Sequence, residues 1–212
     1  MAASRAAAIA KGHPDPAWSA AAANREFPAF ALPPDWDVVV QDGGAILKAD
    51  VALRIMRART GDRVVPEAAQ IDCRPDAVLV RTKTQEVLAQ RAILVLGPWL
   101  SRTLPEMSSV LEVTRQAVGW FMPARPETVL PGRFPLFIIE RRRKDVVYGF
   151  PDFEQRGVKA APHNHGPTVD ADDWDPPATD VELMPVGNAL PSSFRAQRGR
   201  SSIATFASTR TR

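Results

Sequence analysis

Proline constrains the folding of this chain more than any other residue type. Twenty of the 212 residues are proline, roughly twice the usual share of about 5%. Each proline fixes its own φ, lacks a backbone N–H and disfavours helical geometry at the residue before it. We therefore expect short elements joined by many loops, with several strands at sheet edges.

The composition is that of a globular protein. Hydrophobic residues make up 45% and charged residues 24% of the chain, which argues against disorder, a collagen-like repeat or a coiled coil. No stretch approaches the roughly 18 consecutive apolar residues of a membrane span. The segment Ala2 to Ala10 lacks the apolar centre of a secretory signal and is predicted to be helical.

Charge and cysteine usage bound the partners and the compartment. The net charge of +3 comes from 27 basic and 24 acidic residues, so a nucleic-acid partner is only weakly indicated. The expected partners include no nucleic acid and no membrane. Cys73 is the single cysteine, which excludes an internal disulfide and a thiolate metal site. A reducing, cytoplasmic location fits best.

Two helical stretches are predicted. Ala6 to Ala23 is rich in alanine, although Pro14 and Pro16 break it into two pieces. Ala49 to Arg59 repeats apolar residues at helical spacing. Between them, the prolines from Phe27 onward favour an extended segment.

Strands outnumber helices in the rest of the chain. The run from Ala92 to Leu96 is apolar at every position, which is typical of a strand buried on both faces. The segment from Arg195 to Arg212 shows no apolar periodicity and is predicted to be irregular. The other strand candidates, including one hairpin, are Val78–Thr84, Leu111–Met122, Phe134–Glu140 with Asp145–Phe150, and Val158–Ala161.

Taken alone, these patterns indicate a domain of mixed helices and strands. Neither the dinucleotide-binding glycine pattern nor the P-loop pattern is found. Four phrases, however, follow one another in an order that matches a known family. They are Arg25-Glu26-Phe27-Pro28 with Asp42-Gly43-Gly44, Ile93-Leu94-Val95-Leu96-Gly97-Pro98-Trp99, Val113-Thr114-Arg115-Gln116-Ala117-Val118-Gly119-Trp120-Phe121, and Tyr148-Gly149-Phe150-Pro151-Asp152-Phe153 leading to Lys159.

These phrases, between about residues 20 and 190, resemble the monomeric sarcosine oxidase and N-methyltryptophan oxidase family of flavin enzymes. The resemblance implies an α/β fold with α+β character: a fragment of a two-domain FAD-dependent oxidoreductase, with a mixed-sheet substrate domain and the middle of the FAD-binding domain. Residues 1–43 would form a helical segment and begin the substrate domain, 44–112 would belong to the FAD-binding domain, 113–194 would form the substrate sheet, and 195–212 would be a basic tail.

The family also implies a function and a set of site residues. Members oxidise a secondary amine, such as an N-methyl amino acid, to an imine and reduce O₂ to hydrogen peroxide. Lys159 matches a lysine beside the flavin, where a fixed cation stabilises negative charge on oxygen. His163 and Tyr148 match residues that line the substrate cavity, and Gly97 and Trp99 match the cofactor-binding phrase. No metal is expected, because His163-Asn164-His165 lacks a third ligand.

Two family segments do not match. The strand, glycine-rich turn and helix that hold the FAD pyrophosphate are not found, and neither is the Cys-x-Tyr-Thr-x-Thr segment whose cysteine bonds to the flavin. The codons from Ala204 to Arg212, reread two nucleotides along, can spell Asp-Val-Cys-Ile-Tyr-Thr-Asn-Thr. We therefore hypothesise a frameshift between about Asn188 and Ala204. FAD binding and activity of this chain alone are expected to be impaired, unless a neighbouring chain carries the missing segment.

Plainer alternatives stand beside these assignments. Lys159 alone would most often be a solvated surface lysine, and Tyr148 could simply fill a half-buried strand position. Trp120 is expected to pack in the sheet, and Arg141 to Lys144 are expected to form a solvated hairpin tip. For the whole chain, a non-catalytic ligand-binding or partner module that keeps only the substrate sheet is the main alternative, and a basic nucleic-acid-associated protein is a weaker one.

Overall fold

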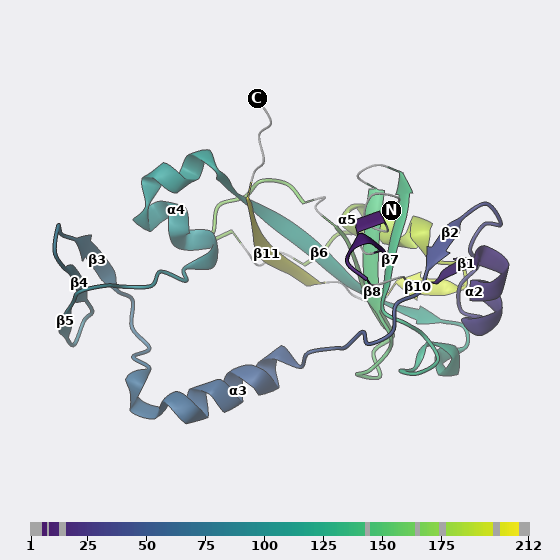
Figure 1. Cartoon of the computed structure of the whole chain (residues 1–212), viewed down its shortest axis with the longest axis horizontal. Coiled ribbons are helices and arrows are strands. Elements are labelled where there is room, and N and C mark those ends of the chain that lie inside the picture. The colour runs from purple at the N-terminus through teal and green to yellow at the C-terminus, as the bar shows by residue number, and fades with distance from the viewer. Residues whose placement is uncertain are drawn as a thin grey trace. The chain divides into compact units, whose positions relative to one another are not determined.

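The computed structural model describes residues 6–7, 9–12, 16–142, 145–163, 166–173, 177–196 and 200–207. The chain divides into two compact units (Figure 1). Unit 1 comprises Met1–Ala45 and Val113–Phe206, and unit 2 comprises Ile46–Glu112 and Ala207–Arg212. No helix among the described residues is long and apolar enough to cross a membrane.

A six-stranded sheet is the centre of unit 1. Its strand order is β10-β6-β9-β8-β7, and β11 also pairs with β6. Every pair whose register is described is antiparallel. The predicted hairpin is confirmed by β7 and β8, and the predicted strands at β6 and β9 are confirmed as well. The strands are β6 (Leu111–Pro123), β7 (Phe137–Arg142), β8 (Asp145–Phe150), β9 (Val158–Pro162), β10 (Phe194–Ala196) and β11 (Arg200–Ala207).

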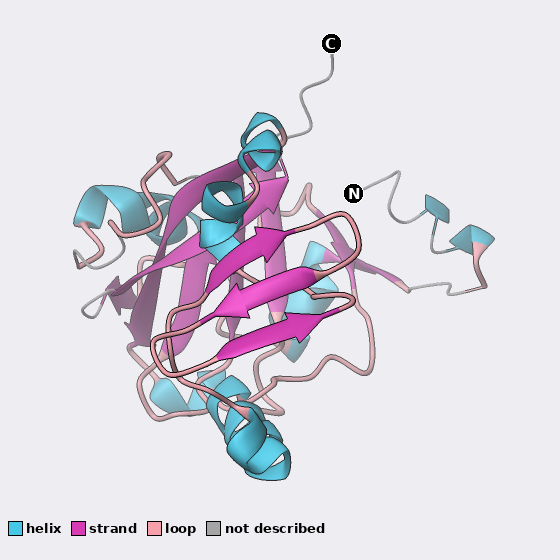
Figure 2. Ribbon diagram, turned by 90° about the vertical axis from the view of Figure 1, so that its left-hand side faces the viewer, coloured by secondary structure: helices cyan, strands magenta, loops and turns pink. Residues whose placement is uncertain are grey.

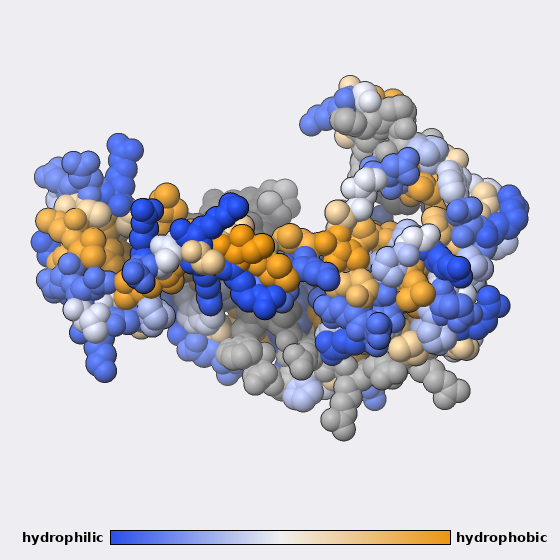
Figure 3. All heavy atoms as spheres, turned by 90° about the horizontal axis from the view of Figure 1, so that it is seen from below, coloured by the Kyte–Doolittle hydropathy of each residue, from blue (hydrophilic) through white to orange (hydrophobic). Residues whose placement is uncertain are grey.

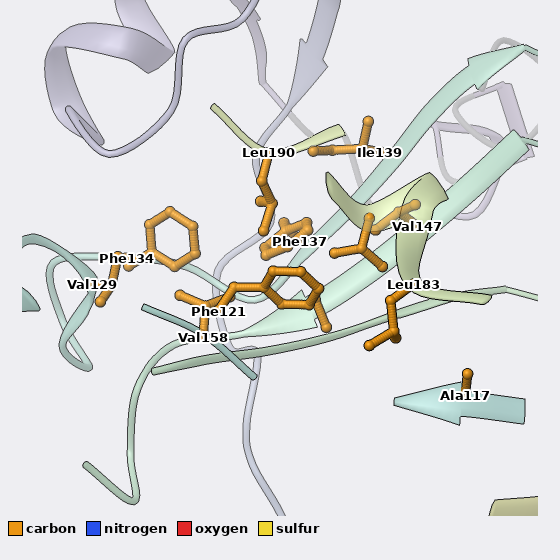
Figure 4. Packing of buried hydrophobic residues seen from close by; sticks show 12 residues of the cluster. Ala117, Phe121, Val129, Phe134, Phe137, Ile139, Val147, Val158, Leu183 and Leu190 are labelled. Atoms are coloured by element: carbon orange, nitrogen blue, oxygen red, sulfur yellow. The ribbon is translucent and has the colours of Figure 1, made fainter. Parts of the chain in front are cut away.

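One face of this sheet forms the hydrophobic core. Because side chains alternate between faces along a strand, Val147 of β8 and Val158 of β9 point to the same side, and both are fully buried. Helix α5 (Asp180–Ala189) covers this face and contributes Leu183 and Val186. Figure 4 shows Val147, Val158 and Leu183 packed with other buried side chains of the core. Burying each such side chain contributes about 1.5–3 kcal/mol.

The N-terminal part of unit 1 packs against the edge of this core. A two-stranded antiparallel sheet pairs β1 (Ala17–Ser19) with β2 (Asp37–Val39), and α2 (Ala20–Glu26) lies between them in sequence. The predicted helical stretch from Ala6 to Ala23 is therefore wrong at residues 17–19. The reason is local: Ser19 is extended and its hydroxyl accepts a hydrogen bond from the Ala22 N–H, so the helix begins only at Ala20.

Unit 2 contains a long helix and a small sheet. The predicted helix at Ala49 to Arg59 is confirmed by α3 (Ala49–Thr60), and the predicted strand from Val78 is confirmed by β4 (Val78–Arg81). Figure 2 shows the antiparallel meander in which β4 lies between β3 (Gln70–Cys73) and β5 (Glu86–Ala89). The shorter elements are η1 (Gly61–Arg63), η2 (Gly97–Trp99), α4 (Leu100–Thr103) and η3 (Pro105–Ser109), while η4 (Pro126–Val129) belongs to unit 1.

The prediction of a strand at Ala92–Leu96 is wrong. These residues are irregular, and Ile93 and Val95 are 91% and 86% exposed. A strand requires a neighbour to satisfy its N–H and C=O groups, and no strand in the described part of the chain pairs with this run. The fold therefore mixes helices with antiparallel sheets rather than a buried parallel sheet.

Two further expectations concern loops and the C-terminal segment. Residues 200–207 form β11 and residues 194–196 form β10, where no periodic element was predicted. Residues of any type can form backbone hydrogen bonds to β6, so a strand can form there without an apolar pattern. Residues 170–173 form a turn in which the Asp173 N–H donates to the Asp170 carbonyl, and residues 174–176 lie outside the described residues. Arg143 and Lys144 of the predicted hairpin tip also lie outside them.

Candidate functional site

The second face of the unit 1 sheet gathers the side chains that could carry chemistry. Val158 and Ala160 of β9 belong to the core, so the alternation places Lys159 and Ala161 on the opposite face. In the register of the sheet, Lys159 lies directly between Trp120 of β6 and Phe150 of β8. Three neighbouring strands thus present a cation flanked by two aromatic rings.

Lys159 is a half-buried cation. Its Nζ lies 5.9 Å from the ring centroid of Trp120 and 5.9 Å from that of Phe150. Among the described residues, no carboxylate lies within ion-pair distance of this ammonium. Cation–π attraction of about 0.5–2 kcal/mol therefore holds it in place without neutralising its charge. An ammonium in this setting is suited to attract an anion.

Tyr148 and His163 lie beside this cation on the same face. Tyr148 is paired in register with Ala161 of β9. Its ring meets that of His163 edge to face, with centroids 6.0 Å apart, and that of Phe150 in the same way at 6.0 Å. The His163 N–H donates to the Val146 carbonyl at 2.7 Å, which extends the ladder one residue beyond β9. The structure thus brings together the three predicted catalytic residues, Lys159, Tyr148 and His163.

The surroundings of Tyr148 and His163 differ. Tyr148 is half-buried, and burial raises the pKa of its hydroxyl above 10.0. The hydroxyl is therefore protonated at neutral pH and can donate a hydrogen bond. His163 is exposed, so its ring nitrogens are accessible to a ligand.

Arg156 is a second cation at this site. Its Cζ lies 4.1 Å from the centroid of the Trp120 ring, which is 8% exposed. Arg156 also makes a long ion pair with Glu154 at 3.9 Å, in which each side chain is about half exposed. The sequence alone did not single out Arg156. Its proximity to Trp120 follows from the β6–β9 register, which places residues more than 30 positions apart side by side.

The loop between β8 and β9 sets the position of Arg156. The Asp152 carboxylate accepts a hydrogen bond from the Arg156 N–H at 2.9 Å. Gln155 has φ +58°, a left-handed conformation that is uncommon for a residue other than glycine. Gly157 follows with φ +93° and lies so close to β6 that a Cβ there would be 2.7 Å from the Phe121 carbonyl oxygen. The loop is therefore tightly constrained immediately before Lys159.

The predicted cofactor-binding residues Gly97 and Trp99 belong to unit 2. They form η2, in which Gly97 adopts φ +54° and Trp99 is 43% exposed. Their role as cofactor contacts stays a prediction. Within the described residues, no three His, Cys, Asp or Glu side chains lie close enough together to hold a metal ion.

We compared the chain with known proteins to identify its relatives. No protein-family model matches the chain. The chain is nevertheless related, distantly and over part of its length, to monomeric sarcosine oxidases and N-methyl-L-tryptophan oxidases.

The individual relatives are as follows. The chain is 26% identical over 156 residues to monomeric sarcosine oxidase of Bacillus sp. (strain B-0618), which covers 70% of this chain and 40% of that protein. It is 30% identical over 106 residues to N-methyl-L-tryptophan oxidase of Escherichia coli O1:K1 / APEC, which covers 50% of this chain and 27% of that protein. The chain thus spans well under half the length of these curated relatives.

A solved structure shows the same fold. The open form of NikD, described as an unusual amino acid oxidase essential for nikkomycin biosynthesis, superposes with a TM-score of 0.70 at 17% sequence identity. The superposition covers 95% of this chain and 56% of NikD. At this level of identity the likeness concerns the fold.

Proposed function

We propose that this chain carries the substrate side of an FAD-dependent amine oxidase of the sarcosine and N-methyl amino acid type. Such an enzyme oxidises a secondary amine to an imine and reduces O₂ to hydrogen peroxide. The observation that carries the proposal is the grouping of Lys159, Tyr148 and His163 on one face of the unit 1 sheet. The partial homology to sarcosine oxidases supports the same assignment.

The residues on this face fit a flavin ring and an acidic amine substrate. Lys159 offers an ammonium without a described anionic partner, and Tyr148 offers a protonated hydroxyl. The sequence contains no glycine-rich dinucleotide motif, so the proposal concerns the ring and substrate side of the site. A bound flavin would supply the two-electron chemistry, accepting a hydride equivalent from the amine and passing electrons to oxygen.

The side chains of this face would have separate tasks. The Lys159 ammonium would stabilise the negative charge that develops on oxygen during its reduction, as preorganised cations do in a water-poor site. The Tyr148 hydroxyl would donate a hydrogen bond to the substrate. The exposed ring nitrogens of His163, next to Tyr148, would orient the substrate from the other side. Trp120 and Phe150 would exclude water from the Lys159 ammonium.

Substitution of Lys159 tests this proposal. The full chain is incubated with FAD, and flavin uptake is followed by fluorescence polarisation and by hydrogen peroxide production with sarcosine or N-methyl-L-tryptophan. The Lys159→Met variant keeps the length of the side chain and removes its charge. Flavin uptake by the chain alone is expected to be weak and should be the same in the variant and the wild type, whereas the amine-dependent peroxide production of the wild type should fall about 10²-fold or more in the variant. Lys11→Met, at an exposed lysine of the same unit, is the matched control and should change nothing.

Other outcomes would redirect the assignment. Thermal shifts with N-methyl amino acids, without flavin uptake or peroxide, would favour the non-catalytic binding module. Equal activity of the Lys159→Met variant and the wild type would remove Lys159 from the site. Absence of any response to flavin or to N-methyl amino acids would overturn the proposed function.

A further inference from the structure

Unit 1 contains a cavity that is separate from the Lys159 face. It has a volume of about 520 Å³ and lies between the segment of α2 and β2 and the strand β7. Lys159, Tyr148 and His163 do not line it. Its lining combines aromatic and aliphatic side chains, among them Phe30, Trp36, Phe137 and Ile139, with main-chain groups of two strands.

The strand β7 borders the cavity with an unpaired edge. It is the last strand in the order of the sheet. The His163 N–H donates to the Val146 carbonyl, so the backbone N–H and C=O of Val146 point toward β9. In an antiparallel ladder, successive residues direct their backbone N–H and C=O groups to opposite sides of the strand. The backbone groups of Val147 therefore point toward β7, where its register partner is Ile139. Ile138, one residue earlier, must direct its N–H and C=O away from β8, toward the free edge.

The strand β2 borders the same cavity from the opposite side, again with an unpaired edge. The Val40 N–H donates to the Pro16 carbonyl at 3.4 Å. The backbone N–H and C=O groups of Val40 and Val38 therefore point toward β1. By the same alternation, Asp37 and Val39 direct their N–H and C=O groups away from β1. In the described part of the chain, no strand pairs with this edge of β2 or with that of β7.

The two unpaired strand edges, of β2 and β7, determine which kind of molecule could occupy the cavity between them. Only an extended backbone presents N–H and C=O groups on both sides at the spacing of a strand. The inner side of the cavity is apolar, because Phe30 stacks on Phe134 at 4.5 Å and meets Phe137 edge to face at 5.5 Å. An apolar side chain would pack there.

The charges on the β2 side add a preference. Asp35 and Asp37 line the cavity and are exposed, and neither has an ion-pair partner among the described residues. The β7 side of the lining carries Arg142 and also Arg141, which is paired with Asp145, so the preference for a basic side chain applies to the β2 side of the cavity alone. A basic side chain of the occupant would offset these two carboxylates.

We propose that this cavity binds one short extended segment of a partner protein, added as a strand between β2 and β7. The segment alternates apolar residues, which pack near Phe30 and Phe137, with basic residues, which lie near Asp35 and Asp37. The inference is independent of the proposed oxidase function, because it involves neither Lys159 nor a cofactor.

A synthetic peptide tests the proposal on the full chain. The probe is a fluorescein-labelled Lys-Val-Lys-Val-Lys-Val-Lys peptide with an amidated C-terminus, and its binding is measured by fluorescence polarisation. The comparison peptide has the same sequence with N-methyl groups on alternate backbone amides, which removes N–H donors and keeps every side chain. Because each hydrogen bond contributes about 0.5–1.5 kcal/mol net, loss of two should weaken binding about tenfold.

Two substitutions at one position separate backbone from side-chain effects. Ile138→Pro removes the N–H that faces the cavity and no ladder bond to β8, as proline is tolerated at strand edges. It should weaken peptide binding about tenfold or more. Ile138→Thr, at a side chain that is 73% exposed, keeps the N–H and should bind like the wild type. Circular dichroism spectra and thermal melts show whether both variants are folded.

Hydrogen exchange locates the bound peptide. Added peptide should slow the exchange of the Asp37, Val39 and Ile138 amides. Binding without protection at these amides, or equal binding of the N-methylated peptide, would overturn the proposal. A dimer of the chain that dissociates on Ile138→Pro, together with no peptide binding, would assign the β7 edge to a second copy and also overturn it.

Discussion

The guanidinium of Arg115 is an almost fully buried charge in unit 1. The side chain is 8% exposed and forms two hydrogen bonds to the Glu182 carboxylate, at 2.8 and 3.1 Å, and one to the Pro177 carbonyl at 3.0 Å. Arg115 comes from β6 and Glu182 from the first turn of α5, so this pair fixes the helix to the sheet. A buried pair is costly to break because the remaining charge loses its partner.

Removal of this arginine should therefore strongly destabilise unit 1. Arg115→Met is expected to lower the free energy of unfolding by about 3 kcal/mol. The matched control is Arg125→Met, whose ion pair with Glu127 is exposed and should contribute less than about 0.5 kcal/mol. Urea denaturation of both variants measures the difference. Equal effects would show that the Arg115–Glu182 pair does not hold α5.

The same pair predicts an acid dependence. Burial alone would raise the pKa of Glu182, but hydrogen bonds from Thr179 and Arg115 outweigh it and hold the pKa below the ordinary 4.5. A carboxyl whose pKa is lowered by folding stabilises the protein above its unfolded pKa and loses that contribution as the pH falls through its folded pKa.

We therefore expect the free energy of unfolding to decrease from neutral pH to about pH 3, and to decrease less for Glu182→Gln. Urea titrations at the two pH values check this. A variant with the same acid sensitivity as the wild type would assign the effect to other carboxyls.

At the scale of elements, the approach of β9 to β6 depends on a glycine. Gly157 has φ +93°, and a Cβ there would lie 2.7 Å from the Phe121 carbonyl oxygen. Phe121 is also the register partner of Val158. Alanine at position 157 would therefore strain the backbone and push the start of β9 away from β6, immediately before Lys159.

A second glycine separates these two effects. Gly132 has φ +83° but nothing within 4 Å of an added Cβ. Gly132→Ala should cost about 1–2 kcal/mol from the left-handed backbone alone. Gly157→Ala should cost about 1–3 kcal/mol more because of the clash. Thermal or urea unfolding compares the two variants, and equal costs would mean that β6 yields without strain.

Local signals in the sequence were sufficient for the strands β6, β7, β8 and β9 of unit 1. Two strand-like segments on either side of a basic run, Phe134–Glu140 and Asp145–Phe150, predicted the β7–β8 hairpin. Helix α5 was not predicted, since Pro185 lies inside it. Its N-terminal signal was nevertheless present: Thr179 and Glu182 form a capping box.

Long-range contacts were harder to infer. The grouping of Tyr148, Lys159 and His163 was expected only from the resemblance to the oxidase family, which matches these three positions. Trp120 and Arg156 were not assigned to the site, because their contact depends on the pairing of β6 with β9. The strand prediction for Ala92 to Leu96 was wrong because it used only the local pattern. The pattern is that of a strand, but a strand also requires a neighbouring strand, which the local sequence does not specify.

At the scale of the whole chain, the two units differ in how much apolar surface they bury. The core cluster belongs entirely to unit 1. Among the described residues of unit 2, Leu79 is the only buried hydrophobic side chain, and α3 exposes Leu53, Ile55 and Met56. Figure 3 shows hydrophobic side chains at the surface between charged ones. Since burial of apolar surface is the main stabilising contribution to folding, unit 2 should be much less stable than unit 1.

This difference predicts separate opening of the two units. Regions with few buried apolar contacts open at a small fraction of the global free energy. Under native conditions, the amides of α3 and of β3–β5 should exchange hydrogen about 10²-fold faster than those of β8 and β9. Trypsin should cut first at Arg54, Arg57 or Arg59 of α3, which leaves the sheet of unit 1 intact. Hydrogen exchange with mass spectrometry and limited proteolysis measure both effects. Exchange at one common rate in the two units would mean that they unfold as a single cooperative body, and that the exposed apolar side chains of α3 are covered in solution.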